Sequence, residues 1–234
     1  MAKLVKSDMI KEIRGKVGDK VYSKNHYGYS VGKVQKAPKG FTPFQKNWQT
    51  VFKYLANLWP QISQEQRDRW NNFARTFRVK DKLGNSFSYT GQNLFTMLNA
   101  KRILINCECN YDAPRVKPIV QLFKELKVDA YYQGEDFRIL LDLKPAINQK
   151  TVVLVHCSKP FSPGVSRTYE HIRIIGLIDS QSKLPLNISF SYLESYKINP
   201  AAGKKLFVQI TPIDKETGFE GSIIKSYTIV GERN

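Results

Sequence analysis

The chain has 234 residues, 41% of them hydrophobic and 24% charged, and its 37 Lys and Arg against 20 Asp and Glu give a net charge of +17. These proportions are typical of a globular protein and exclude a wholly disordered chain, whereas the charge favours an anionic partner or an acidic protein surface. Residues 1–110 carry a net charge of +13 and residues 111–234 only +4. We therefore expect these two parts of the chain to have different roles.

The three cysteines are too few for a disulfide framework in a chain of this length. Cys107 and Cys109 are one residue short of a CxxC half-site, and no second Cys or His pair lies nearby, so we predict neither a metal nor a cofactor. The chain has no apolar run of about 18 residues that could span a bilayer. Because the N-terminal stretch MAKLVKSDMIKEIRGK is too charged for a signal peptide, we expect a protein made in a reduced cytoplasm, without a membrane partner.

Residues 20–35 predict a basic, aromatic β-hairpin. Val and Tyr alternate with polar residues in KVYSKN and YSVGKVQ, and Gly28 supplies the tight turn at 26–28. A lone two-stranded hairpin is marginally stable in water, so we expect it to lie against a later part of the chain or another subunit. Lysines and tyrosines of this stretch form the candidate binding site: Lys16, Lys20, Tyr22, Lys24, Tyr27, Tyr29, Lys33 and Lys36.

Three interpretations of this stretch remain open. In the first, lysines contact phosphates while tyrosines stack on bases or sugars, as in many nucleic-acid binders. In the second, the stretch docks on a neighbouring protein, with Tyr providing contact area and Lys facing acidic patches. In the third, it is a solvated basic hairpin with no special role, because charge runs often lie on ordinary surface.

Two capping boxes predict the next elements. Thr42, Pro43 and Gln45 begin a first helix that ends at Trp59, and Ser63 with Gln66 begins a second. The apolar residues of both fall at helical spacing, and we interpret them as shared core packing. In the first helix these are Phe44, Trp48, Val51, Phe52, Leu55 and Trp59, and in the second Trp70, Phe73, Ala74 and Phe77. The two helices form a predicted hairpin, against which a third helix over 90–105 packs.

A proline-containing stretch at 109–118 is the predicted linker. Beyond it, short β-rich runs separated by turn residues predict about seven strands at the spacing of a β-sandwich. The runs are 126–132, 137–143, 151–158, 171–178, 187–193, 204–213 and 222–230. The segment around Asp214 predicts a hairpin turn, and we expect Asp214 itself at the surface.

Catalytic patterns are absent from the sequence. His26, His156 and His171 share no local motif, and neither a nucleophile elbow, a phosphate-binding loop nor an HExxH pattern occurs. GYSVGK has the wrong glycine spacing and lies on a predicted strand rather than at a strand-to-helix turn. We therefore predict that the protein is not an enzyme, with a hydrolase carrying a carbohydrate-binding sandwich as a distant alternative.

A set of positions in the first hundred residues forms a recognisable pattern, which reads G…VY.RN.YG, TP…Q, L…W..L…QR..W and G.NLF…N. The matching residues are Gly18, Val21, Tyr22, Asn25, Tyr27, Gly28, Thr42, Pro43, Gln45, Leu58, Trp59, Gln66, Arg67, Trp70, Gly91, Asn93, Leu94, Phe95 and Asn99. With this pattern the chain resembles uncharacterised phage and prophage proteins of Bacteroidetes type. Lys24 stands where an Arg is more usual, which keeps the charge but removes a bidentate donor. The resemblance implies a role in a virion or in its assembly. Residues 111–234 resemble fibronectin-type or immunoglobulin-like modules in their pattern of short β-rich runs.

Together these observations predict an α+β protein with three parts. Residues 1–40 are a basic arm with a β-hairpin, 41–110 a three-helix unit, and 111–234 an antiparallel immunoglobulin-like β-sandwich. The leading hypothesis is a non-enzymatic structural component of a tailed-phage virion, which docks to capsid, portal or tail subunits and forms a homo-oligomer in the particle. The alternative is a nucleic-acid-binding protein that neutralises packaged DNA. Under either hypothesis the protein is made in the host bacterial cytoplasm and resides in the virion.

Overall fold

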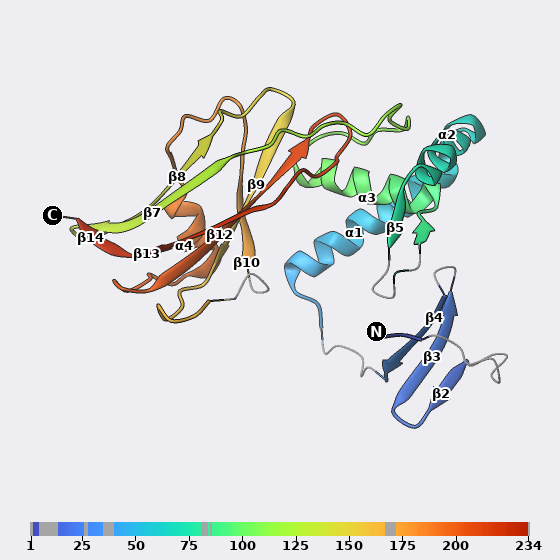
Figure 1. Ribbon diagram of the computed structural model, residues 1–234, viewed down its shortest axis with the longest axis horizontal. Helices are drawn as coiled ribbons and strands as arrows, with labels where there is room; N and C mark the ends of the chain where they lie inside the picture. The colour runs from blue at the N-terminus through green and yellow to red at the C-terminus, as the bar shows by residue number, and fades with distance from the viewer. Residues whose placement is uncertain are drawn as a thin grey trace. The chain divides into compact units, whose positions relative to one another are not determined.

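The computed structural model describes residues 2–4, 14–25, 28–34, 40–80, 84, 86–166 and 172–233. Over these residues the protein is a mixed α+β structure with four α-helices and several sheets (Figure 1). The chain divides into two compact units, Met1–Thr96 with Tyr111–Ala113, and Met97–Asn110 with Pro114–Asn234. The predicted α+β class is therefore confirmed.

An antiparallel sheet opens the first unit, in the order β1-β4-β3-β2 (Figure 1). Its strands are β1 (Ala2–Leu4), β2 (Gly15–Val17), β3 (Lys20–Asn25) and β4 (Gly28–Lys33). The predicted hairpin is confirmed as β3 and β4, but it is not a lone hairpin, because β2 pairs with β3 and β1 pairs with β4. His26 and Tyr27, at the predicted turn, lie outside the described residues.

Three helices follow, and both predicted capping boxes are present. The helices are α1 (Pro43–Leu58), α2 (Gln64–Arg75) and α3 (Gly91–Leu104), with a 3-10 turn, η1 (Trp59–Gln61), after α1. The Gln45 amide donates to Thr42 Oγ1 at 3.2 Å, and the Thr42 amide donates to Gln45 Oε1 at 2.9 Å. Ser63 and Gln66 repeat this exchange at the start of α2. Because two orphan N–H groups are satisfied at each site, these short motifs fix where both helices begin.

Trp70 is at the centre of the helical core of the first unit. Its side chain is 1% exposed, its ring centroid lies 5.4 Å from that of Phe95, and its Nε1 donates to the Tyr111 carbonyl at 2.8 Å. Gly91 allows α3 to begin close to α2, since a Cβ atom there would lie 2.4 Å from Asn71 Oδ1. The expectation of core packing is therefore confirmed for Trp70.

The same expectation is wrong for the beginning of α1. Leu55 and Leu58 are buried, but Phe44 is 55% exposed and Phe52 48%. Only the C-terminal end of α1 is thus covered, because no described residue of α1 before Leu55 is buried. A short hairpin that the sequence did not predict, β5 (Arg78–Lys80) with β6 (Ser86–Ser88), separates α2 from α3.

Two four-stranded sheets form most of the second unit, in the orders β11-β8-β7-β14 and β10-β9-β12-β13. Their strands are β7 (Glu125–Gln133), β8 (Asp136–Lys144), β9 (Thr151–Ser158), β10 (Ile172–Ile178), β11 (Leu186–Asn187), β12 (Lys205–Asp214), β13 (Ile224–Ile229) and β14 (Gly231–Arg233). All pairs are antiparallel except β14 with β7. Both sheets contribute to one core, as shown by Ile139 and Leu141 from the first and Val155 and Val208 from the second.

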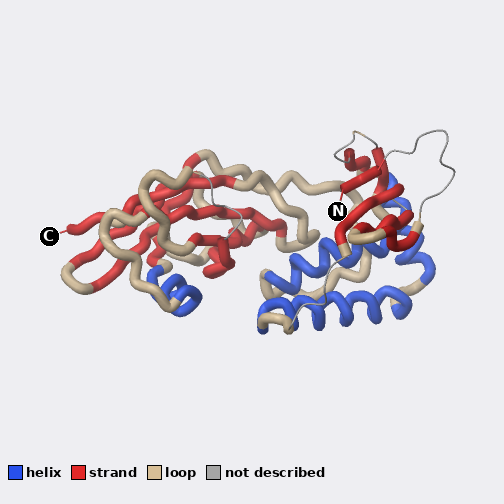
Figure 2. Tube along the Cα trace, turned by 90° about the horizontal axis from the view of Figure 1, so that it is seen from below, coloured by secondary structure: helices blue, strands red, loops and turns tan. Residues whose placement is uncertain are grey.

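The strand predicted over 187–193 is wrong. The chain forms only the two residues of β11 there and then a helix, α4 (Ser189–Tyr196), which lies beside the strands of this unit in Figure 2. Ile-Ser-Phe-Ser-Tyr alternates like a strand, but Ile188, Tyr192 and Tyr196 also recur every four residues, and all three pack into the shared core. Burial of this helical stripe outweighs the local β preference.

The last turns of α3 belong to the second unit. Ile105, just beyond the helix, shares a small core with Val152, Leu154 and Ile213. The Arg102 guanidinium donates to the Lys215 and Glu216 carbonyls, in the turn that follows β12, and its Nε donates to the Glu108 carbonyl at 2.8 Å. Among the residues that the structure describes, none of the helices is both long and apolar enough to cross a membrane.

The predicted turn after β12 is confirmed, but Asp214 is not at the surface. Its side chain is buried, and Oδ1 accepts hydrogen bonds from the Thr217 amide at 2.8 Å and the Thr217 hydroxyl at 2.6 Å. Gly218 completes the turn with φ +77°, and a Cβ atom there would lie 2.3 Å from the Leu98 carbonyl oxygen. The turn is therefore a packed feature of this unit, and its carboxylate has a structural role.

Candidate functional site

The strand register brings most of the predicted binding residues to one face of the N-terminal sheet. Directly opposite one another are Lys20 and Lys33, Tyr22 and Val31, and Lys24 and Tyr29. Opposed residues share a face, and alternate residues of a strand return to it. We call this surface the Tyr–Lys face, and it consists of Val17, Lys20, Tyr22, Lys24, Tyr29, Val31 and Lys33.

One predicted residue lies on the other face. Lys16 is paired with Val21, and the alternation therefore separates it from Tyr22 and Lys24. Beyond Val21, this second face carries the small residues Ser23, Ser30 and Gly32, and Ser23 Oγ lies 2.8 Å from Ser30 Oγ. Of the remaining predicted residues, Tyr27 and Lys36 lie outside the described residues.

The Tyr–Lys face is positively charged and partly apolar. Tyr22, Tyr29 and Val31 are half-buried, whereas the lysines are exposed. Lys24 Nζ lies 5.3 Å from the centroid of the Tyr29 ring, within the range of a cation–π contact. β2, β3 and β4 contain no Asp or Glu. The face can therefore contact an anionic or amphipathic surface without local charge repulsion.

This sheet has no core of its own among the residues that the structure describes. None of the described side chains of β2, β3 and β4 is buried. A sheet of three or more strands needs a hydrophobic face, or packing against a helix, for independent stability. The Tyr–Lys face carries the aromatic side chains of the sheet, so it is the surface that would gain most from being covered.

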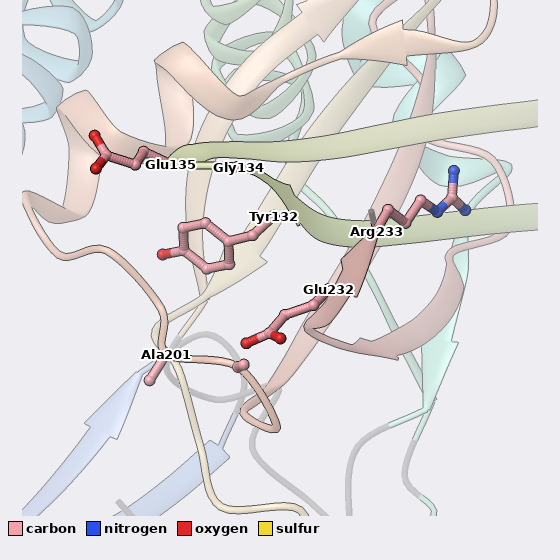
Figure 3. A pocket seen from close by; sticks show the side chains of 7 residues that line it. Tyr132, Gly134, Glu135, Ala201, Glu232 and Arg233 are labelled. Carbon is pink, nitrogen blue, oxygen red and sulfur yellow. The ribbon is translucent and has the colours of Figure 1, made fainter.

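A second candidate is a recess of about 530 Å³ at the edge of the second unit, shown in Figure 3. It is lined by Tyr132, Gly134, Glu135, Ala201, Ala202, Glu232 and Arg233. Figure 3 shows the Glu232 carboxylate on the same side of β14 as the Tyr132 ring, with the Arg233 guanidinium pointing away. The Arg233 guanidinium instead lies 4.0 Å from the centroid of the Tyr131 ring.

The recess offers little reactive chemistry. Burial raises the pKa of Tyr132, and its hydroxyl already donates to the Pro200 carbonyl at 2.8 Å. The Tyr132 hydroxyl is thus neutral at physiological pH and occupied by a structural hydrogen bond. A catalytic acid or base needs a free group with a pKa near the working pH, so we regard the recess as a surface concavity between strands and turns.

Several other groups with shifted pKa values lie inside the second unit and act as packing residues. Burial raises the pKa of the Cys157 thiol to about 12, which removes its nucleophilic thiolate at neutral pH. Burial also raises the pKa of Tyr196 to about 12, and its hydroxyl donates to the Cys157 carbonyl at 2.6 Å. Burial lowers the pKa of His156 and favours the neutral imidazole. Within the described ranges, no three His, Cys, Asp or Glu gather closely enough to hold a metal ion.

Comparisons of the chain with protein-family models, curated proteins and solved structures gave no match. The candidate site therefore depends on geometry alone. Sequence inspection identified its lysines and tyrosines but not Val17 and Val31, which share their face through the register. Working out the register of the predicted hairpin from the short turn at 26–28 would have identified Val31, because β3 and β4 pair closely up to that turn.

Proposed function

We propose that this protein is a non-enzymatic structural component that docks onto neighbouring protein subunits through the Tyr–Lys face of its N-terminal sheet. The observation that carries this proposal is a four-stranded sheet in which no described side chain is buried and the aromatic residues lie on one face. Such a sheet gains stability by lying against another surface. Tyrosine provides large contact area at low entropic cost, and lysines at the rim select an acidic partner.

The second unit supports a role as a displayed module. We propose that it is an immunoglobulin-like sandwich, with β7, β8 and β11 as strands A, B and E, and β9, β12 and β13 as strands C, F and G. In this assignment β10 extends the second sheet beside strand C, as strand C′ does in variable-type domains. The partition of strands between two sheets that share one core supports the assignment.

The particle in which the protein serves is inferred from the resemblance of the N-terminal hundred residues to phage and prophage proteins. On that basis we propose a component of a tailed-phage virion, made in the bacterial cytoplasm and assembled with capsid, portal or tail subunits and with further copies of itself. Several residues of the matching pattern have structural roles in the first unit, such as Trp70 and Phe95, which are in ring contact. Tyr22, in contrast, lies on the Tyr–Lys face.

Nucleic acid is the second candidate partner, and the composition of the same face favours it. Two tyrosine rings and three lysines lie together on strands that carry no carboxylate. Aromatic rings that stack on bases, beside lysines that contact phosphates, are the usual means of binding single strands. On this hypothesis the face would neutralise packaged DNA rather than dock on protein.

The experiment is size-exclusion chromatography with light scattering, at low salt and at about 0.5 M salt, with and without DNA, since binding through several phosphates weakens sharply over this range. We compare the wild type with Lys20→Glu/Lys24→Glu/Lys33→Glu and with Lys16→Glu, which reverses a charge on the opposite face. Docking predicts a salt-resistant assembly, insensitive to DNA, whose size falls in the triple variant and is unchanged in Lys16→Glu. If the chain binds DNA, and does so only at low salt, the result would support the nucleic-acid candidate instead. An assembly unaffected by the triple variant would contradict both.

A further inference from the structure

The first turns of α1 carry a row of exposed aromatic rings. Phe44 and Phe52 are each about half exposed, and Trp48 lies between them. The ring centroids of Phe44 and Trp48 are 6.1 Å apart, and those of Trp48 and Phe52 are 5.5 Å apart. Residues four apart on a helix are neighbours on its surface, so the three rings form one continuous ridge. We call Phe44, Trp48 and Phe52 the aromatic stripe.

The aromatic stripe continues a face that is already used for packing. Leu55 lies on the same side of the helix as the stripe and is fully buried in the helical core of the first unit. The sequence thus extends the packing surface of α1 toward its N-terminus, beyond the part that the described residues cover. Exposed rings in such a row are unusual on a monomeric surface and mark an interaction site.

The charges of α1 identify the chemistry of the surface that fits this row. The helix contains Lys46 and Lys53 and no acidic residue. These lysines lie about 160° and about 140° around the helix from the centre of the stripe. The positions beside the stripe are occupied by the uncharged Gln45 and Gln49. A nucleic acid would need cations next to the rings, and an acidic protein would be drawn to the opposite side. The stripe therefore fits a neutral, apolar surface.

A second copy of α1 provides such a surface. The three rings are equally spaced about Trp48, so an antiparallel pair with its two-fold axis at Trp48 brings Phe44 of each copy against Phe52 of the other. A two-fold interface requires this self-complementarity. The half-exposed rings of two copies bury on the order of 600 Å², and flanking side chains raise this toward the roughly 1,000 Å² of a weak specific interface.

We propose that two copies of this chain associate through antiparallel α1 helices, with the aromatic stripe of each packed on that of the other and the helices crossing at Trp48. The interaction is weak and concentration-dependent, because its area lies at the lower limit for specific interfaces. It does not depend on the Tyr–Lys face. If both surfaces act, the α1 pair is a dimer and the Tyr–Lys face adds further copies to it.

The first test is sedimentation velocity of the full chain from about 1 to about 100 μM, the range in which weak interfaces associate. The variant Phe44→Glu/Phe52→Glu places charges in the stripe at positions that are already half exposed. The matched control, Thr50→Glu, adds a charge on the far side of the same helix. We expect the triple lysine variant of the Tyr–Lys face to remain a dimer. Adding the two stripe substitutions to that variant should give a monomer, and adding Thr50→Glu instead should keep the dimer.

Cysteine cross-linking tests whether the two α1 helices are antiparallel. It also tests the dimer independently if the stripe variant loses its circular dichroism signal and is therefore unfolded. In a background with Cys107 and Cys109 changed to Ser, a mixture of Phe44→Cys and Phe52→Cys chains should form a mixed disulfide on mild oxidation faster than either chain alone. Trp48→Cys should cross-link with itself. The proposal would be overturned if the wild type remained monomeric throughout, if the dimer survived the stripe variant, or if all pairs cross-linked equally. It would also be overturned if another part of the same chain covered the stripe.

Discussion

The N-terminal sheet and the two sheets of the second unit are built from the same kind of hydrogen-bonded ladder but differ in what supports it. In β8, four side chains are buried in alternation, and Ile139 and Leu141 are fully inaccessible. In β2, every residue is exposed, and no described side chain of β3 or β4 is buried. Since hydrogen-bonded strands alone contribute little net stability, strand pairing in this protein is a poor guide to where the stability resides.

The comparison also separates two kinds of role. A sheet whose inward side chains are already buried has covered its apolar surface within the chain, and it needs no partner for stability. A sheet with half-buried tyrosines, in which none of the described side chains is buried, still has apolar surface to bury, and it can bury that surface only against something else. Changes in the two regions should therefore have very different effects on the isolated protein.

The largest effect is expected in the core of the second unit. Ile139→Ala removes three buried carbon atoms where the side chain is 0% exposed, and we expect a loss of about 2–5 kcal/mol in the free energy of unfolding. Urea denaturation followed by far-UV circular dichroism measures it. The comparison variant is Val31→Ala on the Tyr–Lys face, for which we expect less than about 1 kcal/mol. Equal losses would show that the N-terminal sheet has a core after all.

A second prediction concerns the attachment of the end of α3 within the second unit. Arg102→Met keeps the length of the side chain but leaves the Lys215, Glu216 and Glu108 carbonyls without this donor, and we expect a loss of about 1.5–3 kcal/mol. Lys150→Met is the matched control, because it removes an exposed ion pair with Glu216 at 3.4 Å and should change stability by no more than about 1 kcal/mol. A control as damaging as Arg102→Met would contradict the role assigned to the Arg102 hydrogen bonds.

The buried Cys157 in the shared core of the two sheets makes the stability of the second unit sensitive to high pH. The pKa of Cys157 is 9.0 in an ordinary thiol and about 12 when folded, so above pH 9 the unfolded chain releases this proton first. Stability is therefore complete below pH 9 and falls as the pH rises toward 12, by at most about 1.4 kcal/mol per pH unit from this group. Urea midpoints across this range measure the slope, and Cys157→Ala should reduce it. If the slope is unchanged in Cys157→Ala, the loss of stability at high pH comes instead from Tyr192 and Tyr196, whose pKa values burial also raises.

The sequence predicted those elements in which local chemistry and tertiary packing agree. The capping boxes at Thr42 and Ser63 fixed two helix starts, and β9 was predicted with its observed bounds because its run of branched residues lies between clear turns. Prediction failed at α4, where alternation concealed a helical stripe ending in Tyr196, and at Asp214, whose turn is buried by contacts from distant residues. The spacing of apolar residues shows which side of a helix packs but not how much of its length is buried. For this reason the sequence predicts core packing for the aromatic stripe.

The candidate site could be predicted in composition but not in geometry. Lysines and tyrosines near the N-terminus are visible in the sequence, yet the separation of Lys16 from Lys24 depends on the pairing of β2 with β3, and β2 has only three residues. A strand that short carries almost no periodic signal. The domain boundaries predicted at 40 and 110 remain predictions.

The smallest effect on the isolated chain is expected on the Tyr–Lys face itself. Tyr22→Ser should change the free energy of global unfolding by less than about 0.5 kcal/mol, because the side chain is not buried. Hydrogen exchange should show fast exchange of the β3 and β4 amides in the free chain and slow exchange of β9 and β12. In the assembled protein, the β3 and β4 amides should become protected, and Tyr22→Ser should weaken that protection while Lys16→Glu leaves it intact. Slow exchange of β3 and β4 in the free chain would mean that this sheet is already stable without a partner, and the contrast between the two regions would no longer support a docking role.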